Sequence, residues 1–430
     1  MSWEEGVSAE KRTPGVPAVL FVCGDPLLPL YGGGPVRIFA LVDHFRQQGF
    51  RVDVVARDHG PLLNRQIRRR FDRAWILRSP EGSVWGPSRF TRMRRRLTSR
   101  IPWFLKRPLR RWVPLGLRAE SVTPPRNASY ILRKIDPALC ELAGRAAREG
   151  HHDAVISEFA WTARALDQVP EGVLRIIDTH DIQHLRHPTA QAAGRELPHH
   201  RCTREEEVHE LERADILMAI QSEEADILKN LCPKKQIVLA EHALETRGSL
   251  ASPASSKKVL FVGNLYDPNV AGLTNFLERA WPVIRRELPD SELIVCGRVC
   301  EAFESNMEGV RFLGVIPDLG SHYATSAVVI NPVSYGSGLN IKTVEALSFG
   351  KCVVGTPAAF RGIRVPDDMM FRVVESGEDM AGPGIDLLRD SEERARLERQ
   401  THAFAEKYLS PDAIYSELVG VIRRHSQRRA

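Results

Sequence analysis

The stretch that decides the fold is NPVSYGSGLNIKTVEALSFGKCVVGTP, which runs from Asn331 to Pro357. An apolar segment of strand length, SAVVINP (326–332), leads into it, and a glycine turn follows at 336–338. The pattern then predicts a helix from about Asn340 to Phe349, capped by Gly350, and a buried strand in CVVGTP (352–357). Strand, glycine turn, helix and strand make a βαβ unit, which predicts a parallel sheet.

The same rhythm recurs on both sides of this unit. The C-terminal half begins at KVLFVGN (258–264) and continues through ELIVCG (292–297) and VRFLG (310–314). The N-terminal half begins with PAVLFVCG (17–24), the glycine turn at 32–35 and an amphipathic helix that ends at Gly49. Its further strands are expected in RVDVVA (51–56), DAVISE (153–158), LRIIDTHD (174–181), ADILMAIQ (214–221) and QIVLAE (236–241).

A Ser/Pro/Ala-rich segment at 246–257 separates the two halves and is typical of a linker. The sequence therefore predicts an α/β protein with two facing, doubly wound, Rossmann-like parallel-sheet domains, at 16–245 and 258–410. We expect a disordered tail at 1–15 and a C-terminal helix at 411–430 that packs back on the N-terminal domain.

Composition narrows the class of protein. The chain has 430 residues, of which 43% are apolar and 27% charged, as in ordinary globular proteins. No apolar run approaches the ~20 residues that a membrane span needs, and the first residues lack the pattern of a secretory signal. Seven cysteines without a CxxC pair indicate reduced thiols. We therefore expect a cytoplasmic protein without a bound metal.

The net charge of +6 hides an asymmetry, because residues 65–118 carry 17 Lys and Arg against two acids, together with four of the seven tryptophans. This segment is interpreted as a basic, Trp-rich insertion. It could be a solvated arginine-rich face, or it could contact an anionic membrane surface at the inner face or an anionic acceptor. No recognition motif accompanies the charge, so no nucleic-acid partner is expected.

Two glycine turns that follow strands, at 32–34 and 336–338, are suited to bring backbone N–H groups close to phosphate oxygens. Neither matches a P-loop or a dinucleotide fingerprint. Lys342 and Glu345 lie three apart on the helix after the second turn and so share a face. A carboxylate there can accept hydrogen bonds from a ribose diol, and a lysine can reach an anion; the alternative is an ordinary exposed Lys–Glu pair.

These residues resemble a known family. The string at 331–357 resembles the donor-binding signature of GT-B glycosyltransferases, in particular the retaining, family-four-like enzymes called glycosyl transferases group 1. FVGNLYDPNVAGLTNFL (261–277) resembles the first unit of the same domain, and GGGPVR (32–37) and IIDTHD (176–181) resemble the family's glycine loop and histidine loop. The resemblance implies a GT-B fold with an acceptor-binding N-terminal domain and a nucleotide-sugar donor domain at 258–410.

The resemblance also assigns roles to residues. It makes His180, Lys342 and Glu345 the expected catalytic residues, with Glu345 on the ribose of the nucleotide and His180 on the donor sugar. Gly33 and Gly34 would close on the diphosphate from the opposite domain. The remaining donor-binding positions are expected to be Gly263, Asn264, Arg298, Val315, Ile316, Gly336, Ser337, Gly338, Leu339 and Asn340. Of these, Val315 and Ile316 lie in the segment 314–317, which would line the nucleobase. His180 could instead be a structural histidine beside Asp178 and Asp181, and Glu158 is a candidate for acceptor contact.

The sequence departs from the family pattern in two places. A second glutamate usually precedes the ribose-binding one, but Ser337 stands there, with Tyr335 at the alternative alignment. The frequent basic pair after the first C-terminal strand is replaced by a loop that holds Asn264, Asp267 and Asn269. The charge of the diphosphate must then be met by Lys342, by Arg298 or by helix dipoles, and the sequence leaves these three open.

The resemblance implies transfer of a sugar from a nucleotide diphosphate donor to an acceptor hydroxyl, with retention and with neither metal nor cofactor. The acceptor could be a lipid-linked sugar, a polysaccharide or a small natural product. Two alternatives share the fold: a sugar-nucleotide epimerase, and a catalytically silent subunit that binds a sugar nucleotide.

Overall fold

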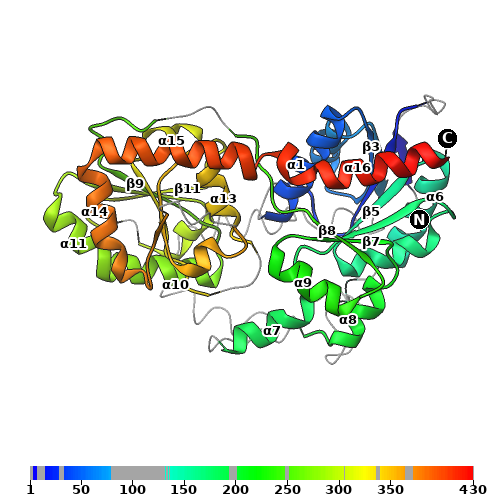
Figure 1. Cartoon of the computed structure of the whole chain (residues 1–430), viewed down its shortest axis with the longest axis horizontal. Coiled ribbons are helices and arrows are strands. Elements are labelled where there is room, and N and C mark those ends of the chain that lie inside the picture. The colour runs from blue at the N-terminus through cyan, green and yellow to red at the C-terminus, as the bar shows by residue number, and fades with distance from the viewer. Residues whose placement is uncertain are drawn as a thin grey trace, which may run out of the picture.

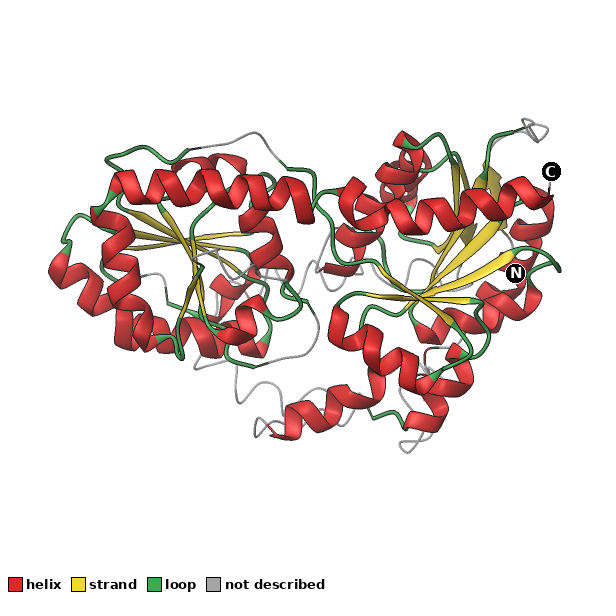
Figure 2. Cartoon of the chain, viewed as in Figure 1, coloured by secondary structure: helices red, strands yellow, loops and turns green. Residues whose placement is uncertain are grey.

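The structure is a computed structural model of the whole chain. It describes residues 3–6, 15–28, 33–78, 131, 134, 136–192, 201–246, 251–304, 306–335, 339–363 and 371–429. The two α/β domains lie side by side, each with one sheet enclosed by helices (Figures 1 and 2). The predicted fold class, two Rossmann-like parallel-sheet domains, is confirmed.

The N-terminal sheet has the strand order β1-β4-β3-β2-β5-β6-β7-β8 and is parallel except for β1, which pairs antiparallel with β4. Its strands are β1 (Trp3–Gly6), β2 (Ala18–Cys23), β3 (Arg51–Arg57), β4 (Arg73–Leu77), β5 (Ala154–Glu158), β6 (Leu174–Asp178), β7 (Ile216–Ala219) and β8 (Gln236–Leu239). Its helices are α1 (Gly33–Gln47), α2 (Pro61–Arg70), α6 (Pro137–Gly150), the 3₁₀ segment η2 (Ala160–Gln168), α7 (Gln183–Ala192), α8 (Arg204–Leu211) and α9 (Ser222–Leu231). The strand order reverses between β2 and β5, which is where open α/β sheets bind ligands.

The C-terminal sheet is parallel throughout, in the order β11-β10-β9-β12-β13-β14. Its strands are β9 (Lys258–Val262), β10 (Glu292–Cys296), β11 (Val310–Gly314), β12 (Val328–Asn331), β13 (Val353–Gly355) and β14 (Arg372–Val373). Its longer helices are α10 (Asp267–Asn275), the π segment η4 (Phe276–Ala280), α11 (Trp281–Glu287), α12 (Gly320–Thr325), α13 (Ile341–Ser348), α14 (Ala381–Arg389) and α15 (Ser391–Tyr408). The short segments η5 (Arg298–Ala302), η6 (Pro357–Phe360) and η7 (Glu378–Met380) complete it. Here the order reverses between β9 and β12.

Each sheet is buried on both faces, which explains why its strands are continuous apolar runs. In β2, Val19 and Phe21 belong to the core under α1, whereas Leu20 and Val22 belong to the core under α6. The side chains of a strand alternate between faces, so one strand of six residues contributes to both layers.

Two sequence expectations differ from the structure. Part of the tail expected to be disordered, Trp3–Gly6, forms β1 on the edge of the sheet. The expected insertion at 65–118 begins with the end of α2 and with β4, which is a regular parallel neighbour of β3. The rest of it, from 79 onward, lies outside the described residues, and the membrane contact expected of it stays a prediction. Among the described residues, no helix is both long and apolar enough to cross a bilayer.

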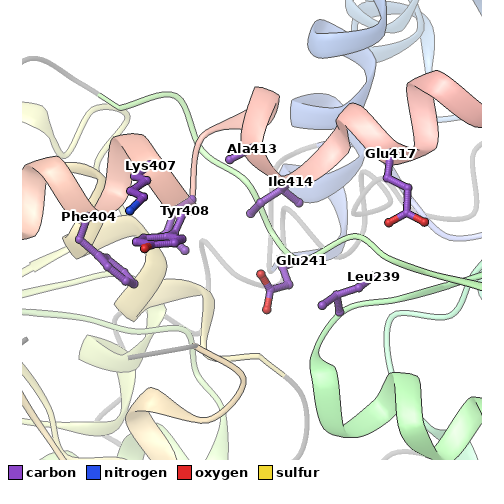
Figure 3. A pocket seen from close by; sticks show the side chains of 9 residues that line it. Leu239, Glu241, Phe404, Lys407, Tyr408, Ala413, Ile414 and Glu417 are labelled. Atoms are coloured by element: carbon purple, nitrogen blue, oxygen red, sulfur yellow. The ribbon is translucent and has the colours of Figure 1, made fainter. Parts of the chain in front are cut away.

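The chain crosses between the domains twice. The first crossing follows β8, and the second joins α15 to α16 (Pro411–Arg429), which runs across the N-terminal domain and packs on α1 through Tyr415 and Leu418 (Figure 1). The backbone N–H of Leu244 donates to the carbonyl of Leu409 at 3.2 Å and ties the two crossings together. Beside them lies a cavity of about 260 Å³, lined by Leu239 at the end of β8, by Glu241 of the first crossing and by residues of α15 and α16 (Figure 3).

Candidate active site

His180 stands at the carboxyl end of β6 and is held on two sides. Its Nε2 lies 2.6 Å from Oε2 of Glu158, and its ring stacks on Phe159 with the centroids 4.0 Å apart and the planes at 20°. Both His180 (φ 57°) and Phe159 (φ 68°) have a positive φ, which residues with a side chain rarely adopt. Such strain persists only where surrounding contacts enforce it and concentrates at functional sites.

Glu158, the candidate for acceptor contact, lies beside His180. It ends β5, its side chain is 2% exposed, and its Oε2 is bound to His180. Its contact with an acceptor stays a prediction.

Asp178, the last residue of β6, is neutralised by Arg37 from α1. The guanidinium donates from Nε and Nη2 to the two carboxylate oxygens at 2.8 and 3.0 Å, and both side chains are fully buried. The third nitrogen, Nη1, donates to the backbone carbonyl of Glu241 at 2.7 Å. Arg37 thus connects the carboxyl edge of the sheet to the first domain crossing.

The charges of this group compensate one another. Burial raises the pKa of Glu158, against the opposing effect of His180. Burial lowers the pKa of His180, but the carboxylates of Asp178 and Glu158 outweigh it and raise that pKa above its ordinary 6.5. Burial would raise the pKa of Asp178, but Arg37 and His180 outweigh it and hold that pKa below 3.8. Within the cluster, the two carboxylates therefore favour the protonated form of His180, and Arg37 favours the ionised form of Asp178.

Glu158, Asp178 and His180 offer ligand atoms within 4.8 Å of one another, a spacing that could hold a metal ion if these atoms were free. Both oxygens of Asp178 accept hydrogen bonds from Arg37, and Glu158 and His180 are bound to each other. A divalent cation would have to displace these partners and sit beside a buried guanidinium. The donor set does not fit a metal.

Gly34 lies over His180. A Cβ at this position would be 3.9 Å from Nδ1 of His180 and 3.6 Å from Cζ of Phe159. Gly33 begins α1, so the start of this helix and the histidine loop meet at the point where the strand order reverses. The two groups that the sequence predicted for one site of the N-terminal domain are brought together.

Lys342, in the first turn of α13, is partly buried and points to the loop after β9 and the first turn of α10 that follows it. Its Nζ donates to Oδ1 of Asn269 at 2.6 Å. The amide nitrogen of Asn269 donates in turn to the carbonyl of Asn264 at 2.9 Å. Burial lowers the pKa of Lys342 to about 7. This loop is where the family's basic pair is missing, so the ammonium of Lys342 occupies that part of the site.

Glu345 lies one turn further along α13 and has a different partner. Its Oε2 accepts a hydrogen bond from the hydroxyl of Tyr323 at 3.1 Å. Tyr323 is fully buried and stacks on Phe349, with the ring centroids 4.3 Å apart. Lys342 and Glu345 therefore contact different partners, Asn269 and Tyr323, and do not form an isolated ion pair with each other.

Arg298 and the nucleobase candidates occupy the neighbouring loops. Arg298 donates from Nε to Glu301 at 3.0 Å in an exposed pair. The loop before it, with Gly297 at φ 98°, packs against the backbone of Gly263. Val315, just beyond β11, is 61% exposed, whereas Ile316 packs against the core. Val315 is thus free to contact a flat ring, as the nucleobase role would require.

The glycine turn itself, Gly336, Ser337 and Gly338, lies outside the described residues. Asn340 is the N-cap residue of α13, and Leu339 precedes it. The hydroxyl of Tyr335 donates to Asp267 at 2.6 Å, so Tyr335 is bound to the same loop that receives Lys342.

The two domains meet where Gly362 of the C-terminal domain approaches Gln221 of the N-terminal domain. A Cβ at Gly362 would lie 2.4 Å from Oε1 of Gln221, at the start of α9, and 3.1 Å from Cδ1 of Leu339. Burial raises the pKa of Tyr266, which lies within the electrostatic reach of Arg186 and Asp181 in the N-terminal domain. Residues from both sheets therefore border one site.

Sequence reasoning missed four residues that shape this site: Arg37, Phe159, Asn269 and Tyr323. Arg37 and Asn269 lie within quoted motifs, but their partners are 141 and 73 residues away, which local spacing cannot reveal. The only sequence signal for Asn269 was its position in the loop that lacks the basic pair.

Comparisons with known proteins agree with this geometry. Residues 256–390 match the family described as Glycosyl transferases group 1. An "Uncharacterized 44.6 kDa protein in cps region" of Klebsiella pneumoniae is 28% identical over 116 residues, which is 24% of this chain and only 30% of that protein.

Solved structures with the same fold cover nearly the whole chain. TarM of S. aureus has a TM-score of 0.65 at 10% identity over 97% of this chain and 100% of its own. A sucrose-phosphate synthase of Thermosynechococcus elongatus has a TM-score of 0.64 at 14% identity, over 95% and 98%. Anabaena HepE, solved in complex with UDP and glucose, has a TM-score of 0.57 at 12% identity, over 94% and 99%. The predicted resemblance to GT-B glycosyltransferases is confirmed for the fold and for the C-terminal domain.

Proposed function

We propose that this protein is an enzyme that transfers a sugar from a nucleotide diphosphate donor to an acceptor hydroxyl. The proposal is supported by the match of residues 256–390 to Glycosyl transferases group 1 and by the GT-B fold of the whole chain. The HepE structures, solved with UDP and with UDP-glucose, support a nucleotide sugar as the donor class. Transfer with retention follows from the resemblance of the signature at 331–357 and is part of the proposal.

The observation that carries the proposal is the pairing of Lys342 and Glu345 on α13. Lys342 presents a partly buried amine whose described partner is the neutral oxygen of Asn269, so an anion would complete the surroundings of its protonated form. Glu345, three residues later, keeps a carboxylate near the surface, held by Tyr323. An anion site one turn from a carboxylate suits a diphosphate joined to a ribose diol.

Catalysis in this proposal is electrostatic. When the bond between the sugar and the diphosphate breaks, negative charge grows on the departing diphosphate, and Lys342 stabilises it together with backbone N–H groups at the start of α13. Removal of one such donor typically raises the barrier by about 2.7–4 kcal/mol. No metal is required in this scheme, and we expect activity to persist in EDTA.

His180 completes the site from the N-terminal domain. Its Nε2 is bound to Glu158, and its Nδ1 faces Gly34 at the start of α1. We propose that Nδ1–H donates to an oxygen of the donor sugar. Closure of the domains would bring this group to the sugar and exclude water that could hydrolyse the donor.

Thermal unfolding with a panel of nucleotide sugars tests the proposal. UDP-glucose, UDP-N-acetylglucosamine, GDP-mannose, ADP-glucose and dTDP-glucose are added in turn to the wild type, and one of them should raise Tm. Glu345→Gln should abolish that rise, whereas Glu287→Gln, exposed at the end of α11, should keep it. A rise that survives Glu345→Gln would contradict the ribose assignment. Interconversion of the donor without acceptor would favour an epimerase, and tight binding without hydrolysis or transfer would favour a silent subunit.

A further inference from the structure

The amide of Asn269 is fixed in one orientation by its neighbours. Its side chain is 5% exposed, its nitrogen donates to the carbonyl of Asn264, and its oxygen accepts from Lys342. The side chain of Asn264 is itself bound to the N–H of Leu265 at 2.9 Å. Because the amide nitrogen is bound to the carbonyl of Asn264, the amide oxygen faces Lys342. The hydrogen bond to this oxygen holds Nζ of Lys342 in one position.

The charged groups around Lys342 have partners of their own. On α10, Asp267 accepts the hydroxyl of Tyr335, and on α13 itself Glu345 accepts that of Tyr323. On α15, which packs against α13, Glu398 pairs with Lys351 and His402 faces Glu406. Within the described part of the chain, no carboxylate forms an ion pair with Lys342. Burial without a counter-charge favours the neutral amine, which is the reason for a pKa of about 7.

We propose that Asn269 is a positioning residue that presents Lys342 to the diphosphate, and that the lysine takes up a proton from solvent when the donor binds. This inference rests on the proposed function. No covalent bond is made or broken: the proton moves from water or buffer to Nζ, and the bound diphosphate supplies the negative charge that keeps it there. A neutral amide is essential to this arrangement, because it orients the amine without providing the counter-charge itself.

The proposal sets the pH dependence of donor binding. With half of the lysines protonated near pH 7, binding should take up about 0.5 proton at pH 7 and about 0.9 at pH 8. The apparent affinity should fall about tenfold between pH 6 and pH 8, because the charged form that binds becomes scarce. The diphosphate of a nucleotide sugar does not titrate in this range, so the proton is not exchanged on the ligand.

Isothermal titration calorimetry measures this uptake directly. The nucleotide sugar with the largest thermal shift in the panel is titrated at pH 8 in two buffers of different ionisation enthalpy, and the difference in observed heat gives the number of protons. Lys342→Arg, which stays charged, should bind without the lysine's uptake and so separates it from any proton exchanged at His180. Asn269→Asp supplies a counter-charge of the same shape, so uptake should vanish and affinity should fall at least tenfold at pH 6.

Asn269→Leu and Asn275→Asp complete the design. The leucine variant should weaken binding while uptake persists, because only the orientation is lost. Asn275→Asp, at the exposed other end of α10, should leave both unchanged. Donor binding without proton uptake at pH 8, or full uptake in Asn269→Asp, would overturn the inference and leave the proposed function intact. Absence of binding by the whole panel would instead contradict the proposed function, and the inference with it.

Discussion

Replacement of Arg37 by Met tests the charge balance at the carboxyl edge of the N-terminal sheet. In the wild type, the guanidinium makes two fully buried hydrogen bonds to Asp178 and a partly buried one to the carbonyl of Glu241, all within 3.0 Å. Methionine keeps the apolar stem but removes both hydrogen bonds to the buried carboxylate, which keeps His180 nearby, at 3.6 Å; loss of one partner of a buried pair typically costs about 3–5 kcal/mol. That is a large part of the ~5–15 kcal/mol by which a domain is stable.

The assay is urea unfolding followed by tryptophan fluorescence at several pH values. Arg46→Met, which breaks the exposed pair with Asp72, is the matched control and should cost at most about 1 kcal/mol. The double variant Arg37→Met/Asp178→Asn removes the stranded charge and should recover most of the loss.

The pH dependence gives an independent check of the sign. Because Arg37 holds the pKa of Asp178 below its ordinary value, the pair stabilises the fold above the unfolded pKa near 3.9, and this is lost as pH falls through the folded pKa. In Arg37→Met the guanidinium no longer opposes the effect of burial, which raises the pKa of Asp178, so the variant's carboxyl takes up a proton as pH falls and its deficit should be largest near pH 7 and shrink toward pH 4. A loss below 1 kcal/mol at pH 7, or a double variant no more stable than the single one, would refute the reasoning.

Two further substitutions probe the C-terminal domain. Tyr323→Phe keeps the stack on Phe349 but removes the hydrogen bond to Glu345. We therefore expect a roughly tenfold higher KM for the donor, with little change in kcat or Tm. An unchanged KM would contradict the role of Tyr323 in positioning Glu345. Gly297 has a φ of 98°, and Gly297→Ala places a Cβ 2.2 Å from the carbonyl oxygen of Gly263, so urea unfolding should show a loss of about 2–4 kcal/mol in the free energy of unfolding. Gly382→Ala, in open space on α14, should be neutral or slightly stabilising. Equal effects of the two substitutions would count against the close approach of the loops at Gly297 and Gly263.

Much of the fold is predictable from sequence because both sheets are buried on both faces. Strands such as β2 and β5 are uninterrupted apolar runs that end at glycine or at polar residues, and these runs locate them within one or two residues. Strand β4 was missed because its five residues lie among arginines, and only its pairing with β3 identifies it. Strand β1 has no apolar run at all, and its place depends on β4 alone.

The candidate site was predictable at the level of helices and loops, but not of contacts. The spacing of Lys342 and Glu345 places them on one face, yet it cannot show that one turns to Asn269 and the other to Tyr323. The same holds for Glu158, because the end of a strand specifies the edge of the sheet, whereas its burial depends on the ring of His180 against it. Residues brought together from distant segments are visible only once the chain is folded.

The double passage of the chain between the domains has a mechanical consequence. Two domains joined by a single linker can rotate about several axes. Two crossings that are hydrogen-bonded to each other at Leu244 and Leu409 favour hinge rotation about one axis that passes through both crossings. The lysine of one lobe and the histidine of the other would then approach along a fixed arc, and their alignment would not have to be found anew at each turnover.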